Sequence, residues 1–489
     1  TLSIAMDSDD LFGSRGIYSH PQNSSVSWER GTSLELIDPA NPDGSNDFQH
    51  NCGIRIQGGA FRSFGLTRKK SFRVLFKDIY GTSKLRYPFF GPTAAQQFDT
   101  LIFRMESNDG YQWGNRTNVQ YARDEFGRCS QLAMGSPSAH GRFMHIYLNG
   151  VYWGLYNVVE RPDDSMGENY FGARKEDWDG VNSGNATNEG STSSWNRLKS
   201  LASGIPNAGS ESSRTAIYME AQGLNPDGTD NPAKADYIDI DNYIDYLLVN
   251  WHMGNNDWPH KNYYHGRERD LLDDAPFTGT RTSAGTHFFS WDAEWSMFLN
   301  SNGDKTGSTS GVAEPYGHLR NSKEFRVRFG DRAHRALFNN GPMTPQKCLD
   351  RYAEICQDHQ SILIPELARW GDQHGTQRTI QHWINEYNHI RDDWLATRTP
   401  EFVSVLQGAN LYPQLGAVTY SQHGGNAPAG GVTMFTDADT IYYTLDGTDP
   451  RLIGGGIRPG SLSATFGGGG PTSQTFMTTG HSWKYWDQG

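Results

Sequence analysis

Residues 256–262 read Asn-Asp-Trp-Pro-His-Lys-Asn and form a segment rich in oxygen ligands. Within this segment Asp257 and Asn262 stand five positions apart. Such a pair suits phosphoryl transfer, because a carboxylate can accept the proton of an attacking hydroxyl while an amide oxygen helps to hold a magnesium ion. Aspartate and asparagine also abound in ordinary loops, so the spacing alone leaves catalysis and a plain turn both open.

Two more carboxylates, Asp292 and Glu294, follow an apolar, strand-like run at residues 287–291. Asp292 stands next to Trp291 and near Trp295, and a carboxylate buried among aromatic rings needs a cation or hydrogen bonds to offset its desolvation. We therefore expect Asp292 to be a second metal-binding carboxylate. The alternative is a surface turn with ordinary acidic residues.

The densest basic cluster is Arg68-Lys69-Lys70, which precedes a strand-like run containing Arg73. Cations at the mouth of a strand can contact the phosphates of a nucleotide, although Arg73 alternates with apolar residues and could equally face solvent. The formal charge of the whole chain is −12. Because broad attraction to nucleic acid or anionic lipid needs clustered lysine and arginine, we expect no nucleic-acid partner.

Several enzyme classes lose support because their signatures are missing: the sequence has no G-x-S-x-G, no H-E-x-x-H and no G-x-x-x-x-G-K-[ST]. His252, His260 and His265 fit no standard zinc spacing, so we interpret them as structural or substrate-facing. No apolar run approaches the roughly 20 residues of a membrane helix. The cysteines lack C-x-x-C spacing and are expected to be buried free thiols, with pairing in an oxidising compartment left open: Cys52, Cys129, Cys348 and Cys356.

The elements that would position these residues begin with strands. Asn149-Gly150 separates two alternating runs and supplies the two positive-φ positions of a type I′ hairpin turn. Helical spacing over residues 119–134 adds one helix to the expected antiparallel sheet. Alternation of apolar and polar residues predicts half-buried strands over four ranges: 53–57, 71–76, 99–104 and 142–147.

The part of the chain after a linker-rich stretch at residues 182–194 is predicted to be mainly helical. Residues 238–251 carry the apolar stripe of an amphipathic helix capped by Asp239 or Asp241. The Asp/Asn-rich stretch 38–47 could bind calcium, but such residues more often form plain turns. Further helical patterns cover three ranges: 322–339, 344–370 and 376–397.

Taken together, these motifs resemble the CotH (spore coat protein H) kinase family, secreted and surface proteins with an atypical kinase-like fold. The resemblance covers residues 54–399, and residues 366–372 look like the helical end of large bacterial members. The hairpin and the Asp-Trp motif are its most specific parts. The matching segments are these: 54–59 (Ile-Arg-Ile-Gln-Gly-Gly), 69–73 (Lys-Lys-Ser-Phe-Arg), 147–156 with Glu160, 256–258 with Asn262, and Trp291-Asp292.

The resemblance implies an exported protein kinase that binds ATP with Mg²⁺ or Mn²⁺ between two lobes and passes phosphate to Ser or Thr of surface or coat proteins. On that basis Asp257 is the catalytic base. The implied metal ligands are Asn262, Asp292 and Glu294. The residues implied at the nucleotide and its phosphates are Lys70, Arg73, Arg55 and Glu160.

The last part of the chain is a small β domain. Residues 441–450 resemble the chitobiase/β-hexosaminidase C-terminal domain, an immunoglobulin-like sandwich that is usually an accessory module. No paired catalytic carboxylate motif accompanies it, so we expect no glycosidase. The aromatic end at residues 483–486 is typical of a strand that begins a further, truncated module.

The expected fold is α+β: a bilobal, atypical kinase-like body followed by an immunoglobulin-like sandwich. Two alternatives to an active kinase stay open, a catalytically silent kinase-like module of a large surface, adhesion or filament protein, and a carbohydrate-associated protein with glycan contacts. The silent module is suggested by Glu294, where family members commonly carry Asp, and by the loop Gly58-Gly59-Ala60. The expected division comprises a β segment 1–51, a first lobe 52–165, a helical lobe 166–400, the sandwich 415–476 and a further module 477–489.

Overall fold

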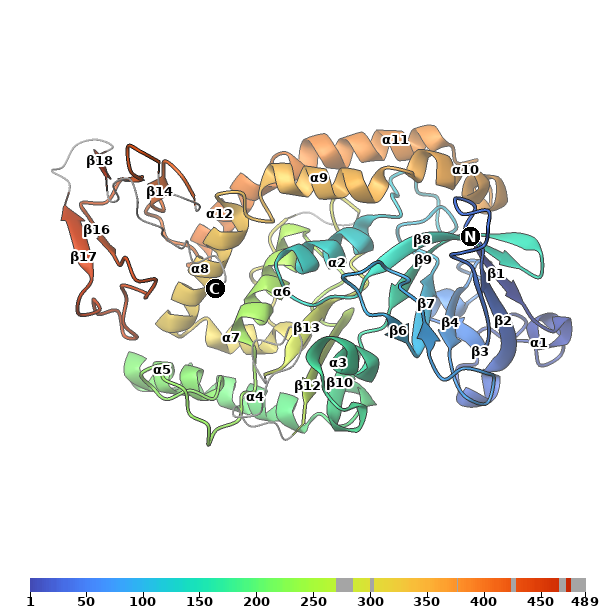
Figure 1. The fold of residues 1–489 in the computed structure, drawn as a ribbon, viewed down its shortest axis with the longest axis horizontal. Helices are drawn as coiled ribbons and strands as arrows, with labels where there is room; N and C mark the ends of the chain where they lie inside the picture. The colour runs from blue at the N-terminus through green and yellow to red at the C-terminus, as the bar shows by residue number, and fades with distance from the viewer. Residues whose placement is uncertain (270–284, 300–302, 376, 424–427, 466–471, 476–489) are drawn as a thin grey trace.

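The computed structural model describes the whole chain except residues 270–284, 300–302, 376, 424–427, 466–471 and 476–489. The further module predicted at 477–489 therefore lies outside the described residues. The described part contains twelve α-helices and several β-sheets, which confirms the α+β class. None of its helices combines the length and the apolar character needed to cross a membrane. Figure 1 shows a strand-rich part, a helical body and a small C-terminal module in succession.

Seven strands close into a barrel in the order β1-β2-β3-β4-β7-β9-β8. The predicted strands correspond to β3, β4, β7 and β8. The predicted boundary at residue 51 falls inside β3. Residues 1–51 also supply β1 and β2, which belong to the same barrel as β3. The barrel strands are these: β1 (Leu2–Ala5), β2 (Arg30–Leu36), β3 (Phe48–Gln57), β4 (Ser71–Leu75), β7 (Thr100–Arg104), β8 (Gly141–Leu148) and β9 (Val151–Glu160).

The hairpin between β8 and β9 has the predicted turn. Asn149 and Gly150 have φ angles of 48° and 79°, the two positive values that a type I′ turn requires. Leu148 pairs with Val151 directly across it. A short pair, β5 (Leu85–Arg86) and β6 (Gln97–Phe98), lies outside the barrel.

The two faces of the barrel strands pack against different cores. Phe72, Leu101 and Phe103 point inward and are fully buried in the barrel interior. Ile102 and Val159 point outward and pack against a cluster of aromatic side chains from the helical body. Because strand residues alternate between faces, every second residue of β3, β4, β7 and β9 lies on this outer side, where the barrel meets the body.

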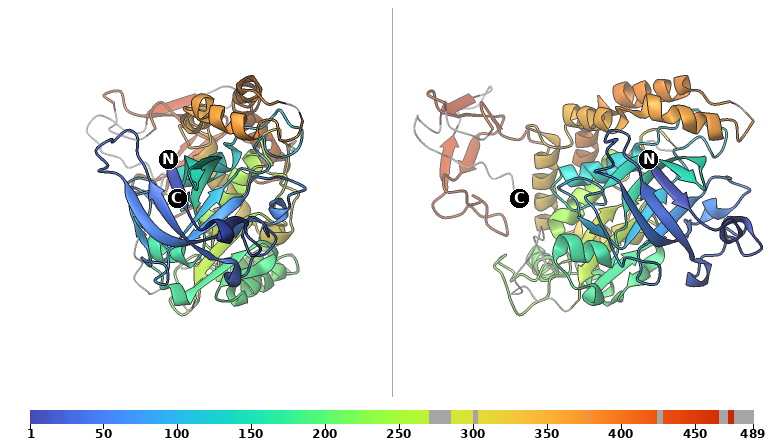
Figure 2. Two further views of the ribbon diagram at one scale, coloured as in Figure 1. Left: turned by 90° about the vertical axis from the view of Figure 1, so that its right-hand side faces the viewer. Right: turned by 45° about the vertical axis from the view of Figure 1, so that its right-hand side comes forward.

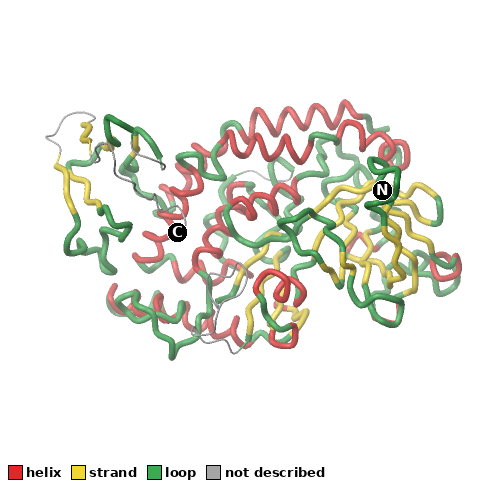
Figure 3. The backbone as a smooth tube through the Cα atoms, viewed as in Figure 1, coloured by secondary structure: helices red, strands yellow, loops and turns green. Residues whose placement is uncertain are grey.

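The helical body surrounds a second sheet of order β11-β10-β12-β13. Figures 2 and 3 show most of its helices on one side of the barrel. Its strands are β10 (Trp178–Asn182), β11 (Ala186–Glu189), β12 (Tyr263–Glu268) and β13 (His287–Ser290). Its helices are α2 (Arg123–Ala133), α3 (Asp164–Phe171), α4 (Ser193–Gly204), α5 (Glu211–Glu220), α6 (Ile240–His252), α7 (Glu314–Leu319), α8 (Lys323–Leu337), α9 (Pro345–Cys356), α10 (His359–Trp370), α11 (Ile380–His389) and α12 (Arg398–Gly408), with α1 (Ser8–Phe12) on the barrel.

Two predicted helices differ from the structure at their ends. Helix α2 begins at Arg123 rather than at residue 119, because the Asp109 carboxylate accepts hydrogen bonds from the backbone of Gln120, Ala122 and Arg123 and holds a non-helical entry. The pattern over 344–370 divides into α9 and α10. Helix α6 has the predicted cap, since Asp239 accepts a hydrogen bond from the Asn242 backbone at 3.0 Å.

The C-terminal module consists of two small sheets, β14-β15-β18 and β16-β17. Its buried apolar core is small, with Met434, Ile441 and Ala464 at its centre. The predicted immunoglobulin-like sandwich stays a prediction. The strands are β14 (Thr419–Tyr420), β15 (Thr433–Thr436), β16 (Thr440–Tyr443), β17 (Leu462–Thr465) and β18 (Thr472–Thr475). All four cysteines of the chain are free thiols, as expected.

Candidate functional site

The chain topology brings the two predicted site loops together. The loop 253–262 joins α6 to β12, and the segment from residue 291 follows β13. Strands β12 and β13 are antiparallel partners in which Tyr263 pairs with Ser290. Asn262, just before β12, therefore lies beside Asp292, just after β13. Both residues adopt left-handed backbone conformations, with φ angles of 60° and 57°.

Hydrogen bonds from Asn262 connect Asp257 with the Asp292 loop. Its Nδ2 donates to Asp257 Oδ2 at 3.0 Å and to the Asp292 carbonyl oxygen at 3.5 Å. Lys261 Nζ lies 2.9 Å from the other carboxylate oxygen of Asp257. The Asp257 and Asp292 side chains remain 20% and 31% exposed, so a ligand can reach both carboxylates.

Arg104 connects the barrel to this loop. It ends β7 on the outer face, and its Nη2 lies 2.7 Å from Asp292 Oδ1 and 2.7 Å from Glu294 Oε1. Its Nε lies 3.1 Å from the buried carboxylate of Asp124 on α2. One guanidinium therefore contacts three carboxylates from two different segments of the body, one of which, Asp124, is also paired with Arg128.

Glu294 lies behind Arg104 and is almost completely buried. Besides contacting Arg104, it accepts a hydrogen bond from the Asn108 backbone. Burial, with the neighbouring Asp292 charge, raises the pKa of Glu294 to about 8. Burial also raises the pKa of Glu106 well above its usual range. Asp257, Asn262 and Asp292 thus form one group, while Glu294 belongs to the buried acid cluster beside it.

Two further arginines lie side by side on the same outer face. Arg55 on β3 pairs across the sheet with Arg73 on β4, and Arg73 pairs with Ile102, two residues before Arg104. Among the described residues neither Arg55 nor Arg73 makes an ion pair or a side-chain hydrogen bond, and Arg73 Nε is buried without a partner. Burial, together with the charges of Arg161 and Arg55, lowers the pKa of Arg73 to about 10. A buried guanidinium nitrogen without a hydrogen-bond partner is costly, so this surface is suited to an anion.

The loop that follows β3 lies next to this arginine pair in the sequence. Gly58 adopts a φ of 106°, and a Cβ atom at Gly58 or Gly59 would contact nothing within 4 Å. Arg62 stiffens the loop, because its side chain donates to the carbonyl oxygens of Gly58 and Ile56. The loop therefore offers open space and accessible backbone close to the arginines.

Lys70 and Glu160 are engaged elsewhere. Lys70 Nζ donates to the backbone carbonyls of Phe61 and Ser63 at 3.1 and 3.0 Å, and burial lowers its pKa to about 8. Glu160 accepts hydrogen bonds from the His140 ring and from the Tyr170 hydroxyl at 2.8 and 2.7 Å. Strand alternation places Glu160 on the face opposite Val159, away from the arginine pair. The Lys70 ammonium is turned toward the loop carbonyls of Phe61 and Ser63 instead.

No sequence pattern indicated a role for Arg104 or for the buried pair of Lys69 with Glu366. Lys69 Nζ lies 2.7 Å from Glu366 Oε1, and both side chains are fully buried. Lys69 belongs to the basic cluster noted in the sequence, but its partner is 297 residues away. Arg104 could have been identified, because it ends a predicted strand on the same face as the outward Ile102.

The three histidines do not converge. His252 and His265 are buried, and burial lowers the pKa of His265 to about 3. His260 is exposed and lies 3.9 Å from Asp257. Over the described ranges, no three His, Cys, Asp or Glu side chains form a preformed metal cluster.

The mixed oxygen set fits a divalent cation by its chemistry. It consists of the carboxylates of Asp257 and Asp292 with the amide of Asn262, and magnesium prefers such hard oxygen ligands and completes its shell with water or phosphate.

Comparison with known proteins gives one family match. A family model described as CotH kinase protein matches residues 54–399. No curated protein matches the chain. Among solved structures, the Shewanella oneidensis MR-1 toxin–antitoxin system HipA, HipB and its operator DNA complex is similar at 10% identity, with 80% of this chain and 67% of that chain covered and a TM-score of 0.25. So low a TM-score supports no inference about the chain.

Proposed function

We propose, from the premise that this chain belongs to the CotH kinase protein family, that it binds ATP with Mg²⁺ or Mn²⁺ where the barrel meets the helical body. The γ-phosphate would pass to Ser or Thr of a protein substrate. The proposal includes a secreted or cell-surface location and a protein partner in a surface assembly, both of which follow from the family alone. The C-terminal module would be an accessory domain.

The observation that carries this proposal is the pairing of Arg55 and Arg73 beside Arg104. Two half-buried guanidinium groups that make no ion pair among the described residues attract an anion. Next to them along the sheet, Arg104 contacts Asp292, which supplies an oxygen ligand for a cation. A nucleoside triphosphate with its bound metal matches this arrangement. Its negative phosphates would lie against the arginines, and its metal cation would lie against the carboxylates.

The roles of the residues follow from their chemistry. Asp257 accepts the proton of the attacking hydroxyl at a carboxylate oxygen, while Lys261 and Asn262 hold that carboxylate in place. Asn262 and Asp292 would hold the metal, which supplies charge neutralisation at the phosphates when bound. Arg55 and Arg73 bind and orient the phosphates. Arg104 fixes the position of Asp292 and keeps the buried acids beside it neutralised.

A second candidate function, a silent kinase-like module, is favoured by one observation. Glu294 and Lys70, both implied at the site by the family resemblance, are fully used in internal contacts, with Arg104 and Asn108 for Glu294 and with backbone carbonyls for Lys70. A module of this kind could bind nucleotide without transferring phosphate. Nucleotide binding and phosphate transfer must therefore be measured separately.

Calorimetric titration of the full chain with ATP and Mn²⁺ tests the binding step. We expect the unaltered chain to bind ATP and Arg73→Ala to lose binding. Asp292→Ala should either lose binding or bind ATP equally well with and without the metal. The control is Asp393→Ala, whose side chain is 67% exposed outside the site and which should bind as the unaltered chain does. If the unaltered chain binds no nucleotide with either metal, the proposal is wrong.

A further inference from the structure

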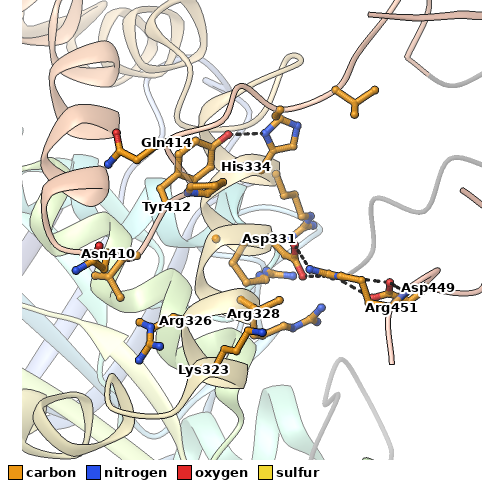
Figure 4. A pocket seen from close by; sticks show the side chains of 18 of the residues that line it. Lys323, Arg326, Arg328, Asp331, His334, Asn410, Tyr412, Gln414, Asp449 and Arg451 are labelled. Carbon is orange, nitrogen blue, oxygen red and sulfur yellow. Dashed lines mark hydrogen bonds and ion pairs between the residues drawn. The ribbon is translucent and has the colours of Figure 1, made fainter. Parts of the chain in front are cut away.

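We infer that the cleft between α8 and the C-terminal module binds an acidic segment of a partner protein. The cleft is a cavity of about 1360 Å³, formed by α8 on one side and by residues around Tyr412, Val418 and Arg451 on the other (Figure 4). None of the residues assigned above to phosphoryl transfer lines it. The inference therefore goes beyond the proposed kinase function and does not depend on it.

The cleft is strongly basic in a chain whose net charge is −12. Seven arginine or lysine side chains line it, against two aspartates. Two of the seven are neutralised from behind by carboxylates of α6: Arg328 Nε lies 2.6 Å from Asp241, and Arg332 Nε lies 3.0 Å from Asp245. These pairs fix the arginines on α8 and account for only part of the positive charge.

A third arginine attaches the C-terminal module to α8. Arg451 Nη1 donates to Asp331 Oδ1 at 3.1 Å, and its guanidinium also contacts Asp449 (Figure 4). A second contact joins the Gly454 backbone to Glu324 at 2.9 Å. Both aspartates that line the cleft thus contact Arg451, Asp331 across the two walls and Asp449 within the C-terminal module.

Four of the seven cations remain: Arg335 on the last turn of α8, which donates to the Met134 carbonyl oxygen at 3.2 Å, and three at or just before the start of the helix. Arg320, Lys323 and Arg326 make no ion pair among the described residues, and Arg320 and Lys323 are exposed. Lys323 and Arg326 are three residues apart on one helix, so their side chains share a face. Arg326 donates to the Arg320 carbonyl oxygen at 2.8 Å, which fixes the turn that carries all three. All three line the cleft.

The opposite wall suits a peptide better than a small anion. Tyr412, Pro413 and Val418 contribute apolar surface, and the Tyr412 hydroxyl is held by the His334 ring at 2.9 Å. The cavity exceeds the roughly 300–1,000 Å³ that usually encloses a small ligand. Arginine clusters beside apolar surface are a recurrent way to recognise acidic or phosphorylated peptide segments. An Asp/Glu-rich segment could place its carboxylates on α8 and its backbone against the tyrosine and proline.

Fluorescence anisotropy with a labelled Asp/Glu-rich peptide and the full chain tests this inference. We expect the double variant Lys323→Glu/Arg326→Glu to lose affinity by about tenfold or more, because rim charges govern such contacts and their reversal adds repulsion. The matched control is Arg174→Glu/Arg197→Glu, two reversals at side chains 71% and 51% exposed outside the cleft, and it should bind as the unaltered chain does.

Three results would overturn the inference: no binding of the acidic peptide to the unaltered chain, equal loss in the control variant, or equally tight binding of an oligothymidylate of matched charge, which would indicate a nucleic-acid or unspecific polyanion surface. Unfolding temperatures of both variants establish that they are folded. ATP titration of the same variants should give unchanged affinity, so failure here is distinguishable from failure of the proposed kinase function.

Discussion

The guanidinium of Arg104 lies 2.7 Å from Oδ1 of Asp292. This contact joins the last residue of a barrel strand to the loop that follows β13, across 188 positions of sequence. The same guanidinium contacts Glu294 and Asp124, so the position of the proposed metal ligand depends on the interface between the barrel and the body.

Replacement of Arg104 should destabilise the protein strongly. Arg104→Ala leaves the buried Glu294 without its cation and leaves Asp124 with Arg128 alone, and the loss of one partner of a buried ion pair typically costs about 3–5 kcal/mol. Urea unfolding followed by tryptophan fluorescence measures this change. Arg391→Ala, at a side chain 42% exposed, should alter the free energy of unfolding little. An equal, small effect of both changes would contradict the role given to Arg104.

Replacement of Arg73 should have the opposite effect on stability. Arg73 is half-buried, makes no ion pair among the described residues, and is repelled by Arg55 and Arg161 more than it is attracted by Asp163. Arg73→Met keeps most of its volume and removes the repulsion, so we expect the folded state to gain about 1 kcal/mol, as residues kept for function often cost stability. ATP binding should be lost at the same time. A lower unfolding temperature together with unchanged ATP binding would show that Arg73 is structural.

Acid should destabilise the protein through His265. Burial lowers the pKa of His265 to about 3, whereas the unfolded chain titrates near the ordinary value of about 6.5. The neutral ring in the folded state therefore contributes stability above pH 6.5, and this contribution is lost as the pH falls. Linkage gives a loss of about 2 kcal/mol between pH 6.5 and pH 5.

A comparison of His265→Phe with the unaltered chain isolates this effect. The centroid of the His265 ring lies 4.4 Å from that of the Trp195 ring and 5.6 Å from that of the Phe288 ring. These aromatic neighbours suit a phenyl ring at the site. Urea unfolding at pH 6.5 and pH 5 should show a smaller loss of stability in the variant. The same loss in both proteins would exclude His265 as the cause.

The buried pair of Lys69 with Glu366 should behave as a coupled unit. Lys69→Met or Glu366→Leu alone leaves one charge buried without a partner and should cost about 3–5 kcal/mol. The double variant should lose less than the sum, although the Leu155 backbone then loses its hydrogen bonds to both side chains. A double-mutant cycle from unfolding free energies measures the coupling. Additive losses would mean that the two residues act independently.

Local features of the fold could be predicted because they depend on neighbouring residues. Asn149 and Gly150 determine the hairpin turn by their own backbone preferences, and Asp239 caps α6 from the adjacent position. The alternation in β4 and β7 likewise follows from the order of apolar residues. The start of α2 could not be predicted, since it is set by Asp109, which precedes the helix by 14 residues.

The site could be predicted only in part. Asp257 and Asn262 lie close together in the chain, and their contact follows from the loop they share. The pairing of Arg104 with Asp292 depends on how the barrel packs on the body, which no local pattern encodes. The family motif suggested that Glu160 lies near the nucleotide. Strand alternation instead places it on the face opposite Val159, away from Arg55 and Arg73.

Transfer of the γ-phosphate tests the central claim most directly. The full chain is incubated with γ-labelled ATP and Mn²⁺ or Mg²⁺, with itself and a Ser/Thr-containing protein as acceptors, and labelled residues are located by mass spectrometry. We predict phosphoserine or phosphothreonine with the unaltered chain, and none with Asp257→Asn, although that variant still binds ATP. Equal labelling by Asp257→Asn, or binding of ATP without any transfer by the unaltered chain, would contradict the account.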